Sequence, residues 1–220
     1  MKLSPAIKKQ ITEDWAKCFP ALGIYKPMWL LRRVGPLVSG ICLERDSGND
    51  AYRPTCHVHN LAKESATVSL TLADPLRTVK TGVPQTIKAA FHQQWFPDSA
   101  VRLQRQAQIP LGGPVHLEDC IRNYRTHMGQ PLWQYAWYLF DDIITLLVWC
   151  EQTPKAEAAL LEFETKMKNW PSRLHPDGGL EAWTTLCRGW IDNPNQVRET
   201  VESQTKMLGL SHLPYVEIQP

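Results

Sequence analysis

Three side chains able to bind a metal ion or act as nucleophiles lie close together at Cys56, His57 and His59. If this stretch is a β-strand, residues two apart share a face, so the two histidines point one way and Cys56 the other. Two imidazoles held about 7 Å apart at the backbone can ligate one ion. They supply only half of a zinc site, because zinc takes three or four ligands and neither HExxH nor Cys-x-x-Cys occurs in the chain.

The missing ligands of such a site would have to arrive through folding, from His92, His116, His127 or the neighbouring Asp141 and Asp142. One hypothesis is therefore a metal-dependent hydrolase that uses His57 and His59 with a helix-borne carboxylate as the third ligand. The other interpretation of the two histidines is a pair of polar residues on a sheet face. That interpretation is favoured, and we expect no cofactor.

The aspartate pair could instead act as acid and base, since burial raises the pKa of a carboxyl group. Adjacent residues on a helix point about 100° apart, however, so Asp141 and Asp142 cannot readily share a proton. We expect at least one of them to pair with an arginine from the strands or to cap a loop.

Motifs for nucleophilic or phosphate chemistry are missing from the sequence. There is no Gly-x-Ser-x-Gly elbow, no P-loop and no Gly-x-Gly-x-x-Gly. Cys56 or Cys150 could form a dyad with a histidine, but six scattered cysteines and seven histidines produce such pairs by chance. The sequence therefore favours a protein without catalytic residues.

The segment 43–54, LERDSGNDAYRP, concentrates side chains that make directional hydrogen bonds. Tyrosine and arginine dominate the hot spots of protein interfaces. We predict a partner-binding surface made of this segment and the two histidines on an exposed sheet face. Its residues are Arg45, Asp46, Asn49, Asp50, Tyr52, Arg53, His57 and His59. The alternative is a solvated loop built from the turn formers at 47–50.

The composition limits the classes of partner. A formal net charge of +2 at pH 7 argues against nucleic acid, which normally requires a clustered basic face. One local exception is the stretch 77–108, whose five basic residues are opposed only by Asp98. It predicts either a site for a phosphate or an acidic partner, or a solvated connector.

The expected location is the cytoplasm. The six cysteines show no close pairing, and the N-terminal stretch MKLSPAIKKQ lacks the apolar region of a signal peptide. The apolar stretch 132–150 carries Asp141 and Asp142 at its middle, where a membrane would penalise them, so a buried central helix is expected there. We expect no membrane partner.

The elements that position these residues follow from periodicity. Apolar residues at steps of four predict a helix over 5–19, and runs rich in β-formers predict strands at 29–34, 37–45, 55–61 and 67–72. The last run has the clearest pattern because Val68, Leu70 and Leu72 alternate with polar residues. Helical stripes then begin after Pro84, one of them at Ile87, Ala90, Phe91 and Trp95, and further stripes continue to Leu208.

The predicted fold class is α+β: an N-terminal helix, a three- to four-stranded antiparallel meander, then five or six helices packed as a bundle. We expect a single domain over 1–220, with the turn-rich stretch 108–114 as a possible division into 1–107 and 115–220.

The stretch RRVGPLVSGICLERDSGNDAYRPTCHVHNLA, residues 32–62, resembles bacterial immunity proteins that neutralise polymorphic toxins. The resemblance rests on general character, because no defined motif is matched. It implies a small cytoplasmic protein that binds a cognate toxin domain and blocks its active site without chemistry of its own. It transfers no functional residue to this sequence.

Overall fold

The structure is a computed structural model that describes residues 3–45 and 50–220. Its main sheet is antiparallel and runs in chain order from β1 to β5. The bounds are β1 (Gly23–Lys26), β2 (Trp29–Val34), β3 (Leu37–Arg45), β4 (Ala51–Asn60) and β5 (Thr71–Pro75). The predicted meander is thereby confirmed, with the predicted bounds of β2 and β3 met at both ends. Strand β1 was not predicted, and β4 begins at Ala51 and not at Thr55.

The long hairpin of β3 and β4 forms the centre of the sheet. Its register runs from Leu37 opposite Asn60 to Arg45 opposite Tyr52. Gly40 lies where β2 approaches β3, and a Cβ atom at this position would lie only 2.1 Å from the carbonyl oxygen of Leu30. Glycine is required there because the backbones approach too closely for any side chain.

The prediction of a strand over 67–72 is wrong, since β5 begins at Thr71. Val68 and Leu72 do reach the core as their alternation indicates. The backbone before β5, however, bonds to side chains instead of to a strand: the amide of Ser69 donates to His59 and that of Ser65 to Gln204. Alternation thus predicted the burial of Val68 and Leu72 but not of Leu70, which is only half-buried, and the backbone hydrogen bonds of this segment go to side chains.

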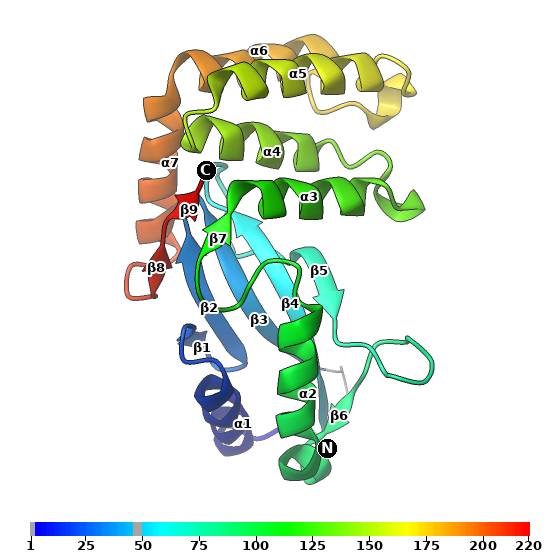
Figure 1. Cartoon of the computed structure of the whole chain (residues 1–220), viewed down its shortest axis with the longest axis vertical. Helices are drawn as coiled ribbons and strands as arrows, with labels where there is room; N and C mark the ends of the chain where they lie inside the picture. Colours follow the sequence, from blue (N-terminus) through cyan, green and yellow to red (C-terminus); the bar gives the residue numbers. More distant parts are fainter. Residues whose placement is uncertain (1–2, 46–49) are drawn as a thin grey trace.

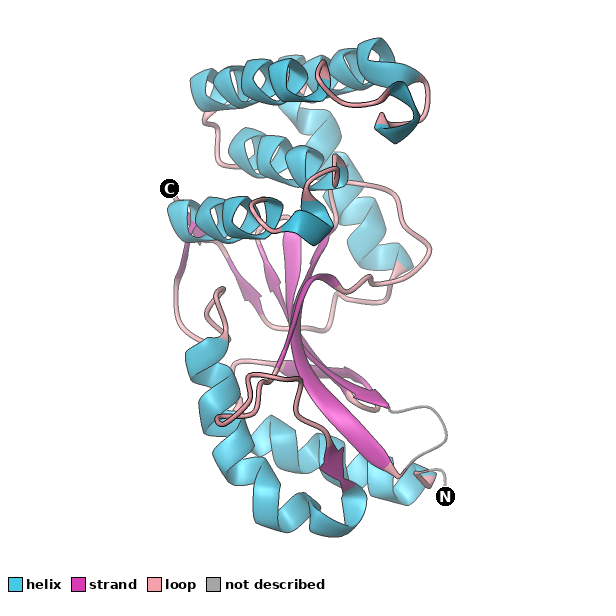
Figure 2. Cartoon of the chain, turned by 90° about the vertical axis from the view of Figure 1, so that its right-hand side faces the viewer, coloured by secondary structure: helices cyan, strands magenta, loops and turns pink. Residues whose placement is uncertain are grey.

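Helices cover the two ends of the sheet. α1 (Pro5–Cys18) and α2 (His92–Gln106) lie at one end, as Figures 1 and 2 show. They enclose a core of their own with residues such as Trp15, Leu30 and Ile41. The helices at the other end form the larger core with the sheet: α3 (Leu117–Met128), α4 (Tyr138–Trp149), α5 (Thr153–Met167), α6 (Gly179–Asp192) and α7 (Pro194–Met207). Six α-helices thus follow the meander in the part of the chain described, within the predicted five or six.

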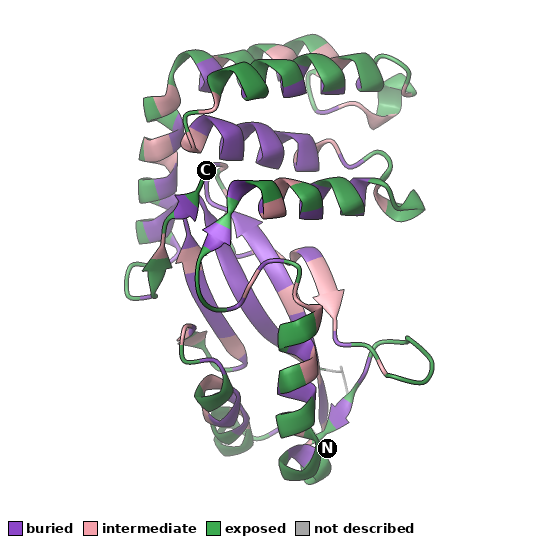
Figure 3. Cartoon of the chain, viewed as in Figure 1, coloured by how far each residue is buried: buried purple, intermediate pink, exposed green. Residues whose placement is uncertain are grey.

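Helix α4 is the buried centre of the helical stack (Figure 3). The predicted central helix is confirmed, but it begins at Tyr138 and not at Leu132, whose side chain is 83% exposed. Among the described residues, no helix combines the length and the apolar character that crossing a membrane requires.

Four very short strands lack any sequence period and were not predicted. β6 (Ile87–Lys88) pairs with β4, and β8 (Tyr215–Val216) pairs in parallel with β2. β9 (Ile218–Gln219) pairs in parallel with β7 (Val115–His116). The C-terminal tail is thereby attached both to the sheet and to the segment that enters α3.

The apolar stripe predicted after Pro84 does not face the core along its length. Ile87 is buried in β6, but Phe91 is 51% and Trp95 47% exposed. Helix α2 begins only at His92 and buries a different face, consisting of His92, Ser99, Ala100 and Leu103. Two large aromatic side chains are consequently left on the surface.

Candidate functional site: a groove beside helix α2

Most of the described residues of the segment 43–54 are strand, with 43–45 at the end of β3 and 51–54 at the start of β4. Arg45 is exposed at the end of β3, whereas Asp50 and Arg53 are half-buried. Tyr52 is fully buried, so its predicted place on a binding surface is wrong. Asp46 and Asn49 lie outside the described residues.

Tyr52 belongs to a buried chain of hydrogen bonds that links strand β4 to helices α1 and α2. Its hydroxyl lies 2.7 Å from Nδ1 of His92 and accepts a bond from Nε1 of Trp15 at 3.1 Å. Nε2 of His92 in turn lies 3.2 Å from a carboxylate oxygen of Asp14. These contacts join α1, α2 and β4, so Tyr52 stabilises the packing of the two helices against the sheet.

The two histidines of β4 are enclosed, so the expectation of an exposed sheet face is wrong for them. His57 is 2% and His59 3% exposed. The segment between β4 and β5 covers this face and is held to α7 by the bond from the Ser65 amide to Gln204. Strand periodicity identified the shared face but could not identify what covers it.

Burial keeps both imidazoles neutral. It lowers the pKa of His57 to about 3, and the ring packs edge-on against Trp29 with centroids 5.0 Å apart. Burial also lowers the pKa of His59 to about 4. Nδ1 of His59 accepts a bond from the Ser69 amide at 3.2 Å, so the proton of the neutral ring lies on Nε2.

Folding does bring His59 and the aspartate pair to one cavity of about 240 Å³ between β4 and α4. The position that a metal ion would need is taken by the Lys63 ammonium, 2.7 Å from Asp142 and 3.5 Å from Asp141. No three His, Cys, Asp or Glu side chains of the described residues are placed to hold one metal ion. The expected arginine partner of the aspartates is thus a lysine.

The aspartate pair is tied into the surrounding elements. Asp141 accepts a bond from Nε1 of Trp183 at 2.6 Å, and Asp142 accepts one from Asn60 at 2.9 Å. Burial raises the pKa of Asp141 to about 6, against the opposing effect of Lys63. The pair therefore anchors α4 to β4 and α6.

The cysteines considered as nucleophiles are protonated at neutral pH. Burial raises the pKa of the Cys150 thiol to about 11 and that of Cys56 still further. A thiol without thiolate character is a poor nucleophile.

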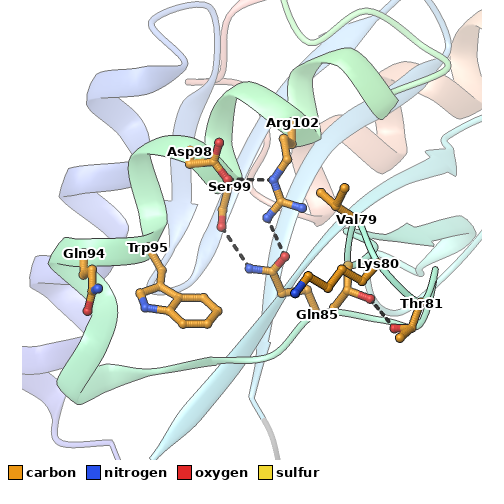
Figure 4. A pocket seen from close by; sticks show the side chains of 10 residues that line it. Val79, Lys80, Thr81, Gln85, Gln94, Trp95, Asp98, Ser99 and Arg102 are labelled. Carbon is orange, nitrogen blue, oxygen red and sulfur yellow. Dashed lines mark hydrogen bonds and ion pairs between the residues drawn. The ribbon is translucent and has the colours of Figure 1, made fainter.

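A different place on the molecule has the character of a binding site. A cavity of about 580 Å³ opens between the loop 78–81 and α2 (Figure 4). Trp95 lies on the helix side, and Val79, Lys80 and Thr81 lie on the loop side. Val79 is 82% exposed, so two large apolar side chains border one hollow.

The wall of this groove, which we call the α2 groove, is held by a hydrogen-bond network. Arg102 donates to Asp98 at 2.8 Å, to the Arg77 carbonyl at 3.0 Å, and also to Gln85. The Gln85 amide donates to the hydroxyl of Ser99 at 3.3 Å. Because Gln85 and Ser99 are buried, the wall is formed before any partner arrives.

The chemistry available in the α2 groove is that of recognition. Its lining consists of hydroxyls, amides, one ion pair and an indole: Thr78, Val79, Lys80, Thr81, Gln85, Gln94, Trp95, Asp98, Ser99 and Arg102. The carboxylate of Asp98 is already engaged with Arg102. Such a set can contact an apolar side chain and direct hydrogen bonds to a partner.

Comparisons with protein-family models, with curated proteins and with solved structures gave no significant match. The resemblance of residues 32–62 to immunity proteins therefore remains a prediction. The geometry of the α2 groove is therefore the basis for a functional proposal.

Part of the α2 groove was visible in the sequence. The stretch 77–108, in which basic residues outnumber acidic ones, contains every lining residue of the groove. The exposed tryptophan was missed, since Trp95 fits the apolar stripe of a buried face. The excess of basic over acidic residues was the signal that pointed to this region.

Proposed function

We propose that this chain is a non-enzymatic protein that binds another protein, with the α2 groove at the centre of the contact surface. The observation that carries the proposal is the half-exposed Trp95 facing the exposed Val79 across a preformed cavity. Apolar side chains gathered around a hollow are typical of partner sites, and tryptophan is enriched among interface hot spots.

The charge around the groove favours an acidic partner. Lys80, Lys88 and Arg105 are exposed and form no ion pair with any residue that the structure describes. The partner would place one large apolar side chain in the groove and carboxylates near these cations. The positive electrostatic potential of the cations would attract it, and burial of the apolar side chain would hold it.

A stable interface buries roughly 1,600 Å² in total, which exceeds one groove. The surface extends to Phe91 and Val83, which are 51% and 54% exposed. It also reaches the predicted segment 43–54, because β6 pairs with β4 and the Ala89 amide donates to the Asp50 carbonyl at 2.8 Å. Arg45 and Asp50 can thus lie at its rim.

The finer form of the proposal is an immunity protein that acts in the cytoplasm and blocks a cognate toxin domain. It is supported by the resemblance of residues 32–62 and by a groove whose groups suit recognition. The partner would then be the product of a neighbouring gene, toxic when expressed alone.

Co-expression with the product of the neighbouring gene tests both forms. Wild-type protein should co-purify with that partner and protect cells from it. Trp95→Ala and Val79→Asp should each weaken binding at least tenfold, since a hot-spot truncation costs about 2 kcal/mol. Leu161→Ala is the matched control, because Leu161 is 65% exposed on α5, away from the groove.

Two results would contradict the proposal. Unchanged affinity of the Trp95→Ala, Val79→Asp double variant would remove the groove from the interface. Tight binding of DNA that collapses as salt rises would assign the basic surface to nucleic acid instead. Co-purification without protection would retain the protein-binding proposal and reject its immunity form.

A further inference from the structure

A third cavity, of about 400 Å³, lies where β2, the end of α4, helix α7 and the C-terminal tail meet. These elements are distant in sequence but adjacent in the fold, as Figure 1 shows. The cavity is lined by three basic side chains, two aromatic rings and two hydroxyls among others: Arg33, Arg198, Lys206, Trp149, Tyr215, Thr205 and Ser211.

Each guanidinium in this cavity is stacked on an aromatic ring. Cζ of Arg33 lies 5.1 Å from the ring centroid of Tyr215, and Cζ of Arg198 lies 5.0 Å from that of Trp149. Stacking holds the plane of a guanidinium and leaves its edge available for hydrogen bonds.

Glu217 fixes both rings. Its carboxylate accepts a bond from Nε1 of Trp149 at 2.8 Å and another from the hydroxyl of Tyr215. The two arginines are therefore oriented by a shared support that does not itself line the cavity.

Of the basic side chains that line this cavity, Arg33 is the one without a partner among the described residues. Within the described residues its side chain has no hydrogen bond or ion pair, and its Nε is buried without a partner. Arg198 bonds to Glu151 at 3.0 Å and to the Trp149 carbonyl at 3.3 Å, while Lys206 pairs with Glu202. An unpaired buried guanidinium nitrogen is costly. Nε of Arg32 and Nε of Arg53 are also buried without a partner, and Arg33 differs from them because it lines a cavity that a bound group can enter.

Of the three cations in the lining, Lys206 pairs with Glu202 and Arg198 with Glu151, so Arg33 is the one that forms no ion pair with a described residue. We propose that this cavity binds the phosphate group of a small phosphorylated molecule. Arg33 contacts two phosphate oxygens and supplies the unbalanced charge, Arg198 and Lys206 add N–H donors, and the hydroxyls of Thr205 and Ser211 donate to the remaining oxygens.

Calorimetry on the full chain with inorganic phosphate and with glycerol phosphate tests this assignment. At constant ionic strength, saturable binding of both probes is expected in wild type. Arg33→Gln should weaken it at least tenfold, and Arg198→Gln should weaken it less because Arg198 is already partly engaged. Arg188→Gln, an exposed arginine on α6, is the matched control and should bind as wild type does.

Arg33 lies on β2, so circular dichroism and thermal unfolding must show that its variant is folded. Arg198, half-buried on α7, supplies a second variant if the first is unstable. No saturable heat with either probe would overturn the proposal, as would equal affinity of the Arg33 and Arg188 variants. Binding of succinate but not of phosphate would assign the cavity to carboxylates and equally reject it.

Discussion

Two buried aspartates, Asp14 and Asp141, lie at opposite ends of the sheet, and their pKa values are shifted in opposite directions. Burial works to raise the pKa of Asp14, but hydrogen bonds from Gln10, Lys17, Gln93 and His92 outweigh it and hold this pKa well below its ordinary value. Burial also raises the pKa of Asp141, where Lys63 and Trp183 oppose it only in part, and the result is about 6. Burial alone therefore does not decide the charge of a carboxyl group.

The difference lies in how many donors reach each carboxylate. Asp14 is on an outer helix, where α1 and α2 can both supply side chains. Asp141 is on the central helix α4 and shares a single lysine with Asp142. Both clusters attach helices to the sheet, and neither has an open, reactive carboxylate. This comparison leads to three predictions.

Removing the shared lysine should have the largest effect. Lys63→Met leaves two buried carboxylates without a cation, which costs about 3–5 kcal/mol in the free energy of unfolding. Chemical denaturation at pH 7 measures it. Lys168→Met, which breaks only the surface pair with Glu164, should cost about 0.5 kcal/mol or less. Equal losses in the two variants would show that the pair is not anchored by Lys63.

Changing the well-supported carboxylate should have an intermediate effect. Asp14→Asn removes charge-assisted hydrogen bonds and should cost about 2 kcal/mol at pH 7. Because the folded-state pKa lies below the ordinary value of 3.8, this stabilisation is present above pH 3.8 and is lost as the pH falls through the folded-state value. Urea unfolding at pH 7 and pH 3 should show a smaller difference between wild type and variant at the lower pH. A constant difference would contradict the lowered pKa.

The smallest effect should have the opposite sign. The folded-state pKa of Asp141 is raised from 3.8 to about 6, so its stabilisation is present below pH 3.8 and is lost as the pH rises through 6. Asp141→Asn cannot ionise and keeps an acceptor for Trp183, so it should be more stable than wild type at pH 7 by on the order of 1 kcal/mol.

The measurement is the difference in unfolding free energy between the Asp141→Asn variant and wild type from pH 4 to pH 7. A difference is needed because His57, whose lowered pKa gives the reverse slope, contributes equally to both proteins. The advantage of the variant should grow with pH. An advantage that shrinks over this range would refute the raised pKa.

Local chemistry predicted much of the fold. The helix predicted over 5–19 is α1, which ends one residue earlier at Cys18, and Ser4, whose role as its cap was not predicted, accepts a bond from the Ile7 amide at 3.3 Å. The strands β2 and β3 ended where their turn residues indicated. The two-residue strands of the tail carry no such signal, because their pairing depends on partners about a hundred or more residues away.

The candidate site was less predictable. Period-2 alternation correctly places His57 and His59 on one face, and the stretch with the basic excess contains the residues that line the α2 groove. The sequence cannot show that the segment after β4 covers the histidines, nor that Trp95 is left outside. Both outcomes depend on which other element packs against a given face.

By itself the sequence determined the fold class, the bounds of β2 and β3 and those of α1 to within one residue, because propensities and turns act within a few residues. Only the tertiary structure decided which of its reactive-looking side chains are enclosed and which apolar ones are exposed. The physical reason is that a repeat identifies the residues sharing a face, whereas burial of that face depends on contacts between segments far apart in the chain.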